Sequence, residues 1–157
     1  MSETSELFIS EKLKLQPSPV HGTGVFACQN INKDEVIEVS PLLRLDWKLK
    51  YMHDKVIRNY CWMNKSCQCE DCKIHGPALY LALGYGSLYN HHDNPNTNIK
   101  IDYTKGTITV ISKQEINSED EIFVSYGSKY FSSDRRKAYQ SDTTKERKDE
   151  QEGPKHT

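Results

Sequence analysis

Two stretches near the middle of the chain carry the residue types most suited to chemistry. The first, residues 84–96, places two adjacent histidines and two tyrosines among glycines, asparagines and a proline. Turn-forming residues set the backbone of such a stretch and leave its polar side chains available, which is typical of a loop that forms a site. The second, residues 61–75, holds four of the five cysteines and a histidine. Both stretches depend on surrounding elements to position them.

The cysteine-rich stretch has the spacing C-x5-C-x-C-x2-C-x2-H. Thiolates and imidazoles are the ligands that zinc prefers, and four of them complete its tetrahedron. The sequence therefore favours a structural zinc ion as one hypothesis and a reduced, metal-free loop as the other. A catalytic zinc is disfavoured because the pattern offers no evident open coordination position or general base. The candidate ligands are Cys67, Cys69 and Cys72, with Cys61 or His75 as the fourth.

Length and charge restrict the function classes. The 157 residues are enough for one domain with a tail. The net charge of −1 gives no nucleic-acid footprint, and no apolar run is long enough to span a membrane. The N-terminus lacks the basic and apolar regions of a signal peptide, so five cysteines indicate a reducing, intracellular compartment rather than a disulfide framework. We therefore expect no direct nucleic-acid partner and no membrane.

Short strands make up most of the predicted elements around these residues. Alternating apolar and polar residues predict strands within 7–15, 25–28, 35–39, 42–45, 98–103, 106–112 and 122–125. Ser40 and Pro41 are expected to separate two of these strands. Asp46 is expected to cap a helix that starts at Trp47, and the apolar run 77–83 is expected to form a buried helical turn.

Two further short motifs lie near the ends of the chain. Gly22-x-Gly24 precedes a predicted strand and alone is typical of a hairpin turn. It lacks the third glycine and the βαβ context of a dinucleotide-binding fingerprint, so a Rossmann fold is not supported. Glu121-Ile122-x-x-x-Tyr126 contains the predicted strand 122–125, and alone it would place a tyrosine at the end of that strand, in the core.

In this order, the glycine pair, Asn90-His91-His92-x-x-Pro95-Asn96 and Glu121-Ile122-x-x-x-Tyr126 resemble the SET domain of protein-lysine methyltransferases, especially the minimal viral and bacterial members. The resemblance implies a mostly-β fold, a β-clip of small sheets with short helices and a C-terminal pseudoknot, in which the last segment passes beneath the Asn-His loop. We expect residues 1–131 to form the domain, with a Cys-rich insert at 61–75, and residues 132–157 to form a charged, disordered tail.

The resemblance also implies S-adenosylmethionine as cofactor and a protein lysine as methyl acceptor. Tyr126 matches the catalytic tyrosine, and Glu121 is expected to hold the terminal segment. Cofactor contacts are implied for Gly22, Thr23, Gly24, Asn90, His91, Tyr126 and Phe131, and a lysine channel lined by Tyr85, Val124 and Tyr130. The chain departs from the family pattern at His92, where serine is usual, and in carrying its cysteines inside the domain.

Histone H3 is the substrate class that the resemblance favours, and the protein would then be cytoplasmic or nuclear, in a host nucleus if it comes from a virus or pathogen. A domain this small could complete its substrate groove by forming a homodimer. Two other functions compete: a non-catalytic binding module on a SET scaffold stabilised by zinc, and a zinc-dependent hydrolase. Binding of S-adenosylmethionine would distinguish the methyltransferase from the binding module. Treatment with a chelator would distinguish it from the zinc-dependent hydrolase, because methyl transfer needs no catalytic metal.

Overall fold

The computed structural model describes residues 7–48 and 52–127. The chain divides into two compact units, Met1–Val124 and Ser125–Thr157. All strands and helices of the described residues belong to the first unit, and of the second only residues 125–127 are described. The predictions for Tyr130, Phe131 and the charged tail therefore lie outside the described residues. Within the described ranges, no helix is long and apolar enough to cross a membrane.

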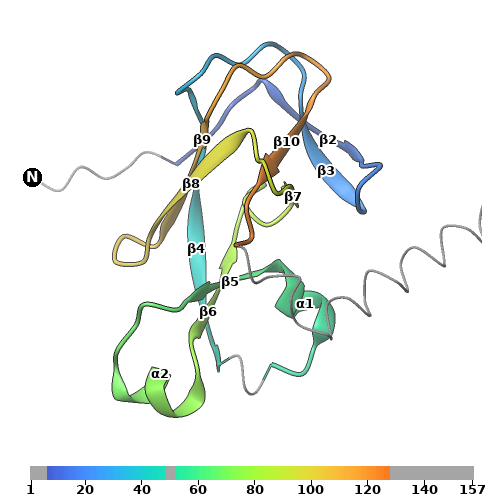
Figure 1. The fold of residues 1–157 in the computed structure, drawn as a ribbon. Coiled ribbons are helices and arrows are strands. Elements are labelled where there is room, and N and C mark those ends of the chain that lie inside the picture. The colour runs from blue at the N-terminus through green and yellow to red at the C-terminus, as the bar shows by residue number, and fades with distance from the viewer. Residues whose placement is uncertain (1–6, 49–51, 128–157) are drawn as a thin grey trace, which may run out of the picture. The chain divides into compact units, whose positions relative to one another are not determined.

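The first unit contains two β-sheets and two short helices (Figure 1), and the predicted mostly-β fold class is confirmed. The larger sheet has the order β5-β6-β4-β9-β8, with β1 attached to β4. Its strands are β1 (Phe8–Ile9), β4 (Val36–Lys48), β5 (Cys61–Asn64), β6 (Ala78–Ala82), β8 (Thr97–Asp102) and β9 (Thr107–Ser112). The smaller sheet has the order β2-β3-β10-β7 and consists of β2 (Leu13–Pro17), β3 (Thr23–Ala27), β10 (Glu121–Val124) and β7 (Asn90–His91). The helices are α1 (Lys55–Tyr60) and α2 (Glu70–His75).

The predicted hairpin near residue 105 is confirmed, because β8 and β9 pair antiparallel from Thr97↔Ser112 to Asp102↔Thr107. The Asp102 carboxylate accepts hydrogen bonds from the backbone N–H groups of Thr104 and Lys105, which closes the turn. Gly106 has φ = 65°, a left-handed conformation that glycine adopts without steric cost.

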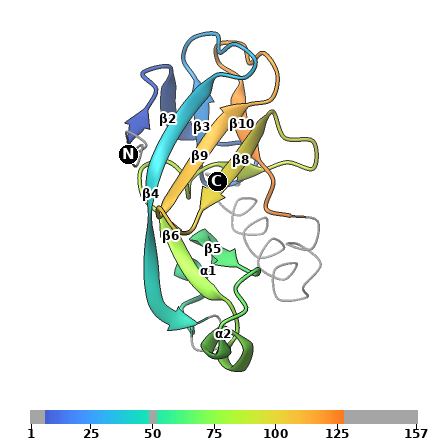
Figure 2. The same ribbon diagram turned by 90° about the vertical axis from the view of Figure 1, so that its left-hand side faces the viewer.

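The predicted break at Ser40 and Pro41 is wrong, because β4 runs without interruption through both residues. Residues 36–41 of this strand pair with β9, whereas the residues from Leu42 onward pair with β6 (Figure 2). Pro41 lies where β4 passes from one partner to the other. A proline, which donates no hydrogen bond, is tolerated at such a point, while its carbonyl still accepts from Leu83 N at 2.9 Å.

Two predicted helices are also wrong. Trp47 lies in β4, and the first helix begins eight residues later, where Asp54 caps it by accepting a hydrogen bond from Ile57 N at 2.8 Å. The run 77–83 contains β6 rather than a helical turn. Since β6 lies between β5 and β4 and is almost wholly buried, both of its faces are apolar and the alternation that marks a strand is lost.

Candidate functional site

The smaller sheet brings the three sequence motifs together, and we call it the motif sheet. Strand β10 lies at its centre, antiparallel to β3 with Ile122 opposite Val25, and parallel to β7 with Phe123 opposite Asn90. In the order of the sheet, β10 therefore lies between β3 and β7. A two-residue strand such as β7 is too short to be recognised from periodicity, so this pairing was not predicted from the residues alone.

The Glu121 carboxylate connects the motifs through side-chain hydrogen bonds. Its Oε1 accepts from Asn90 Nδ2 at 2.8 Å, and its Oε2 accepts from Ser18 Oγ at 2.9 Å. Asn90 Nδ2 also donates to the backbone oxygen of His21 at 3.0 Å. All of this lies in the interior, since Ser18, Asn90 and Glu121 are less than 10% exposed. Glu121 therefore joins the glycine turn, the Asn-His motif and β10.

Gly24 is required by the same carboxylate. A Cβ built on Gly24 would overlap Glu121 Oε1, so any larger residue would displace the group that holds Asn90. Gly22 differs, because a Cβ there meets no atom within 4 Å in the described chain, but its φ of 48° still favours glycine. Glycine is therefore favoured at Gly24 by lack of space and at Gly22 by backbone conformation. Gly22 and Thr23 are exposed at the end of the β2–β3 hairpin.

In the loop that follows Asn90, side chains form hydrogen bonds with the backbone of β10, as the backbone of a neighbouring strand would. Asn96 Nδ2 donates to the Glu121 carbonyl at 2.9 Å, and Asn96 Oδ1 accepts from Phe123 N at 2.8 Å. Thr97 Oγ1 donates to the Phe123 carbonyl at 2.6 Å. His92 lies at the position where the SET pattern described above usually has a serine. Its Nδ1 accepts a hydrogen bond from Asn94 N at 3.0 Å, and the centre of its ring lies 5.2 Å from that of Phe123. The loop therefore keeps its own hydrogen bonding despite the replacement.

A second buried carboxylate, which sequence reasoning missed, holds the segment before Asn90. Glu38 is fully buried in β4 and accepts hydrogen bonds from Ser40 Oγ at 2.5 Å, Tyr85 N at 2.8 Å and Tyr89 Oη at 2.6 Å. Burial, with the Glu38 charge second, raises the pKa of Tyr89 well above its usual value, so the phenol stays protonated and donating. A Cβ on Gly84 would lie 2.5 Å from Ser40 Oγ. In the sequence Glu38 is one of several charged residues in and around β4, so nothing there distinguished it from a surface residue.

The other predicted site residues have these positions. His91 lies in β7 opposite Val124, and its Nε2 lies 3.1 Å from Asp93 Oδ1. Val124 is fully buried, and Tyr85 is half-buried at the start of a turn in which Leu88 N donates to its carbonyl at 2.7 Å. Tyr126 belongs to the second unit and follows β10 by two residues in the chain.

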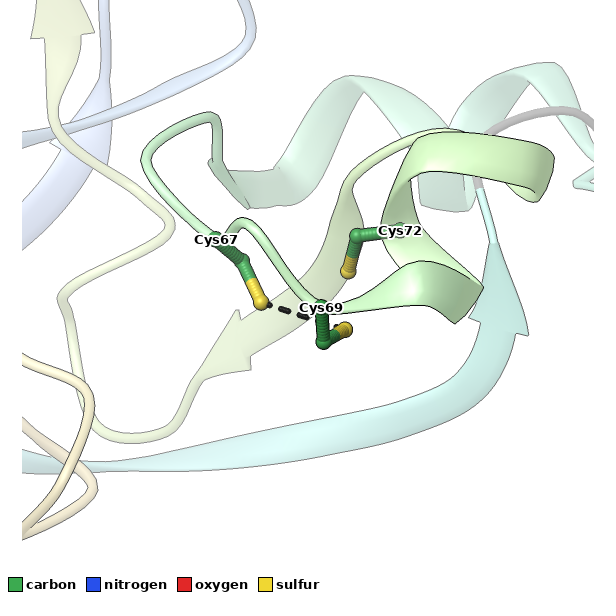
Figure 3. A group of neighbouring side chains, drawn as sticks. All are labelled: Cys67, Cys69 and Cys72. Atoms are coloured by element: carbon green, nitrogen blue, oxygen red, sulfur yellow. Dashed lines mark hydrogen bonds between the residues drawn. The ribbon is translucent and has the colours of Figure 1, made fainter.

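Three of the predicted metal ligands come together away from the motif sheet (Figure 3). The Sγ atoms of Cys67, Cys69 and Cys72 all lie within 4.8 Å of one another, and those of Cys67 and Cys69 are 3.4 Å apart. Cys61 and His75 are not part of this group in the described chain. Cys61 instead donates to the Ile57 carbonyl at 3.2 Å.

A lysine lies beside the cysteine group. Lys48 Nζ is 2.8 Å from Asp71 Oδ2 and 3.4 Å from Cys72 Sγ, and the Asp71 carboxylate is the main cause of a raised pKa at Lys48. The pKa of Cys72 is lowered to about 7, chiefly by its hydrogen bond with Cys69 and further by Cys67 and Lys48, against the opposing effect of burial. Cys72 can therefore supply a thiolate near neutral pH, whereas the pKa of Cys69 is raised.

Comparison with known proteins gives a consistent result. The SET domain family matches residues 22–127 of the chain. A histone-lysine N-methyltransferase of Schizosaccharomyces pombe, specific for lysine 37 of histone H3, is 30% identical over 119 residues, which are 76% of each chain. The crystal structure of a Plasmodium falciparum protein assigned as a histone methyltransferase matches with a TM-score of 0.57 and 29% identity, over 78% of this chain and 99% of that one.

The matched range begins at Gly22 and ends at Gly127, so it includes all three motifs that the motif sheet assembles. The fold, the order of the motifs and both relatives agree with this family match. The chain therefore belongs to the SET-domain family of protein-lysine methyltransferases.

Proposed function

We propose that this domain transfers a methyl group from S-adenosylmethionine to the ε-amine of a histone lysine, with the cofactor held at the edge of the motif sheet. The observation that carries the proposal is the parallel pairing of β7 and β10, locked by the hydrogen bond between Asn90 and Glu121. It supports a site in which the glycine turn, the Asn-His motif and the segment leading to Tyr126 act together.

The residues present fit the cofactor. Asn90 uses Nδ2 for two protein acceptors, while its Oδ1 accepts no hydrogen bond from the described residues and can receive one from the cofactor's ammonium group. The exposed turn at Gly22 and Thr23 offers backbone groups close in sequence to His21, whose carbonyl Asn90 contacts. We assign the cofactor contacts to this turn and to Asn90 and His91, and a covering role to Phe131.

The cofactor, when bound, supplies an activated methyl group on a sulfonium. The residues of this chain must align the amine and keep it unprotonated, because a solvated lysine has a pKa of about 10.4 and is almost fully charged at neutral pH. We assign the orientation of the amine to the Tyr126 hydroxyl. A channel formed by Tyr85, Val124 and Tyr130 would disfavour the charged amine by desolvation. Val124, already buried, fits an apolar wall.

The substrate class follows from the relatives. The Schizosaccharomyces pombe protein is named for lysine 37 of histone H3, and the Plasmodium falciparum protein is described as a histone methyltransferase. We propose histone H3 as the substrate of this chain too, which would place its activity in a nucleus.

The test is methyl transfer from labelled S-adenosylmethionine to core histones, with the full chain and a Tyr126→Phe variant. We expect label on histone H3, and a loss of about 100-fold in the variant because the amine is no longer oriented. Tyr60→Phe is the matched control, since Tyr60 lies in α1, is 40% exposed and changes by the same single hydroxyl. Its rate should equal that of the wild type.

Calorimetric binding of S-adenosylmethionine separates the failures. Binding without transfer to any histone, but with transfer to another protein in a cell lysate, would contradict the histone assignment alone. An absence of both binding and transfer would contradict the enzyme. Full activity in Tyr126→Phe would remove the proposed role of that hydroxyl.

A further inference from the structure

The cysteine group lies outside the motif sheet, and its geometry is that of a ligand set. Cys67 precedes α2, Cys69 is its N-terminal flanking residue and Cys72 lies within it, so one turn and one helix present three sulfurs to a common point (Figure 3). We propose that Cys67, Cys69 and Cys72 bind one Zn²⁺ ion that stabilises the segment between β5 and β6.

The sulfur positions agree with tetrahedral zinc. A tetrahedral site with Zn–S distances of about 2.3 Å places its sulfurs about 3.8 Å apart. The three sulfurs lie 3.4 Å apart at one pair and within 4.8 Å at all pairs, so small side-chain rotations suffice. Soft thiolates at short spacing select zinc over the hard cations, which prefer oxygen.

The charge around the group also suits a metal thiolate. Three thiolates and one Zn²⁺ carry a net charge of −1, and the Lys48 ammonium group lies 3.4 Å from Cys72 Sγ. Lys48 is itself only 7% exposed and is held by Asp71 at 2.8 Å. A buried cation beside a sulfur is the kind of outer contact that orients ligands and balances charge at metal sites.

The segment between β5 and β6 is held by the burial of Cys72 in a core cluster and by the ion pair between Asp71 and Lys48. Helix α2 has six residues, of which only Cys72 is buried, and Cys69 makes no side-chain capping hydrogen bond. Helices this short are not stable by propensity alone, and they require packing or a cross-link. Metal binding supplies such a link, because its free energy becomes folding free energy for the ligating segment.

The test is zinc content of the reduced full chain after dialysis, together with Co²⁺ titration followed by visible absorption. We expect about one zinc per chain and the thiolate-to-cobalt charge-transfer band of a tetrahedral site. Cys72→Ser and Cys69→Ser should each lower the zinc affinity at least about tenfold, and Lys48→Met should lower it by about tenfold through its outer contact.

Cys28→Ser is the matched control, because Cys28 is also a free, half-exposed cysteine but lies outside the group. It should retain zinc. Cys61→Ser and His75→Ala identify the fourth ligand. Loss of zinc in one of these variants identifies that residue as the ligand, and retention of zinc in both identifies water. Either result supports the site. Full zinc retention in Cys72→Ser, or equal loss in Cys28→Ser, would overturn the proposal.

Discussion

The motif sheet and the cysteine lobe, which we define as residues 61–77, are stabilised in different ways. In the motif sheet, buried side chains from distant parts of the chain bond one another, as Glu121 does with Asn90 and with Ser18, which is 103 residues away in sequence. In the cysteine lobe only Cys72 is buried, in a core cluster that includes Leu42, and Asp71 forms an ion pair with Lys48. The first region is fixed by buried polar contacts, whereas in the second one side chain is buried and the proposed zinc ion would add a cross-link.

This difference explains where each region tolerates change. A buried carboxylate with satisfied partners is costly to disturb, because every lost contact leaves a buried donor or charge. No buried side-chain nitrogen or oxygen lacks a partner in the described part of the chain. In the cysteine lobe, by contrast, most side chains can change without leaving a buried group unpaired. The exceptions are the sulfurs of the triad and Asp71, which pairs with the buried Lys48.

Gly24→Ala should give the largest effect and break the motif sheet. Its methyl group would overlap the Glu121 carboxylate and displace it from Asn90, which we expect to cost about 3 kcal/mol of unfolding free energy. Gly22→Ala is the control, because its methyl group meets open space and only the positive φ is penalised, by about 1 kcal/mol. Urea unfolding measures both. Equal costs would show that backbone conformation, not the carboxylate, sets the requirement.

Tyr89→Phe should weaken the hold of β4 on the segment before Asn90. Glu38 would keep its bonds from Ser40 and from Tyr85 N but lose its third donor, which we expect to cost about 2 kcal/mol because the carboxylate is buried. Tyr103→Phe serves for comparison, since its hydroxyl donates to a neutral carbonyl, that of Met63. A smaller loss for Tyr89→Phe than for Tyr103→Phe in urea unfolding would contradict the importance of Glu38.

Removal of zinc should affect the cysteine lobe alone and so sharpen the contrast. We expect a chelator to speed amide exchange in residues 61–77 about tenfold, equivalent to about 1.4 kcal/mol of local opening free energy. Exchange in β3 and β10 should stay unchanged, because their bonds do not involve the lobe. Hydrogen exchange with mass spectrometry resolves the two regions, and a uniform change across both would refute their independence.

The smallest effect is expected at the surface pair of Lys12 and Glu35, whose Nζ and Oε1 are 2.7 Å apart. The hydrogen bond from Lys12 lowers the pKa of Glu35, so the pair stabilises the fold above the ordinary carboxyl pKa and loses this effect as the pH falls through the lowered value. Because both side chains are partly exposed, we expect about 0.5 kcal/mol. In Glu35→Gln, the unfolding free energy should fall by about 0.5 kcal/mol less than in the wild type when the pH is lowered through the acid range. An unchanged fall would contradict the contribution of the pair.

The sequence predicted the fold class through motifs and failed where tertiary partners decide. The hairpin of β8 and β9 was predicted because its turn residues and alternation agree. Strand β6 was mistaken for a helix because a strand buried on both faces has no alternation, and Pro41 was mistaken for a break because its position between two partner strands has no local signal.

The candidate site shows the same limit. Asn90 and Glu121 were recognised by their motifs, but the hydrogen bond that joins them, across 31 residues of sequence, depends on the parallel pairing of β7 with β10. Glu38 and Tyr89 carried no motif at all, since their relation exists only once β4 and the loop meet. The cysteines were close enough in sequence for their grouping to be predicted directly, although not which of them would come together.

The central place of β10 in its sheet has a consequence for biosynthesis. Strands β2, β3 and β7 are complete by residue 91, yet β3 and β7 have no partner on their facing edges until residues 121–124 have left the ribosome. Until then those edges can pair with other chains, which makes the nascent protein prone to aggregation. Contacts of such long range also slow folding. A chaperone that shields the nascent chain should therefore raise the soluble yield more than a lower growth temperature alone.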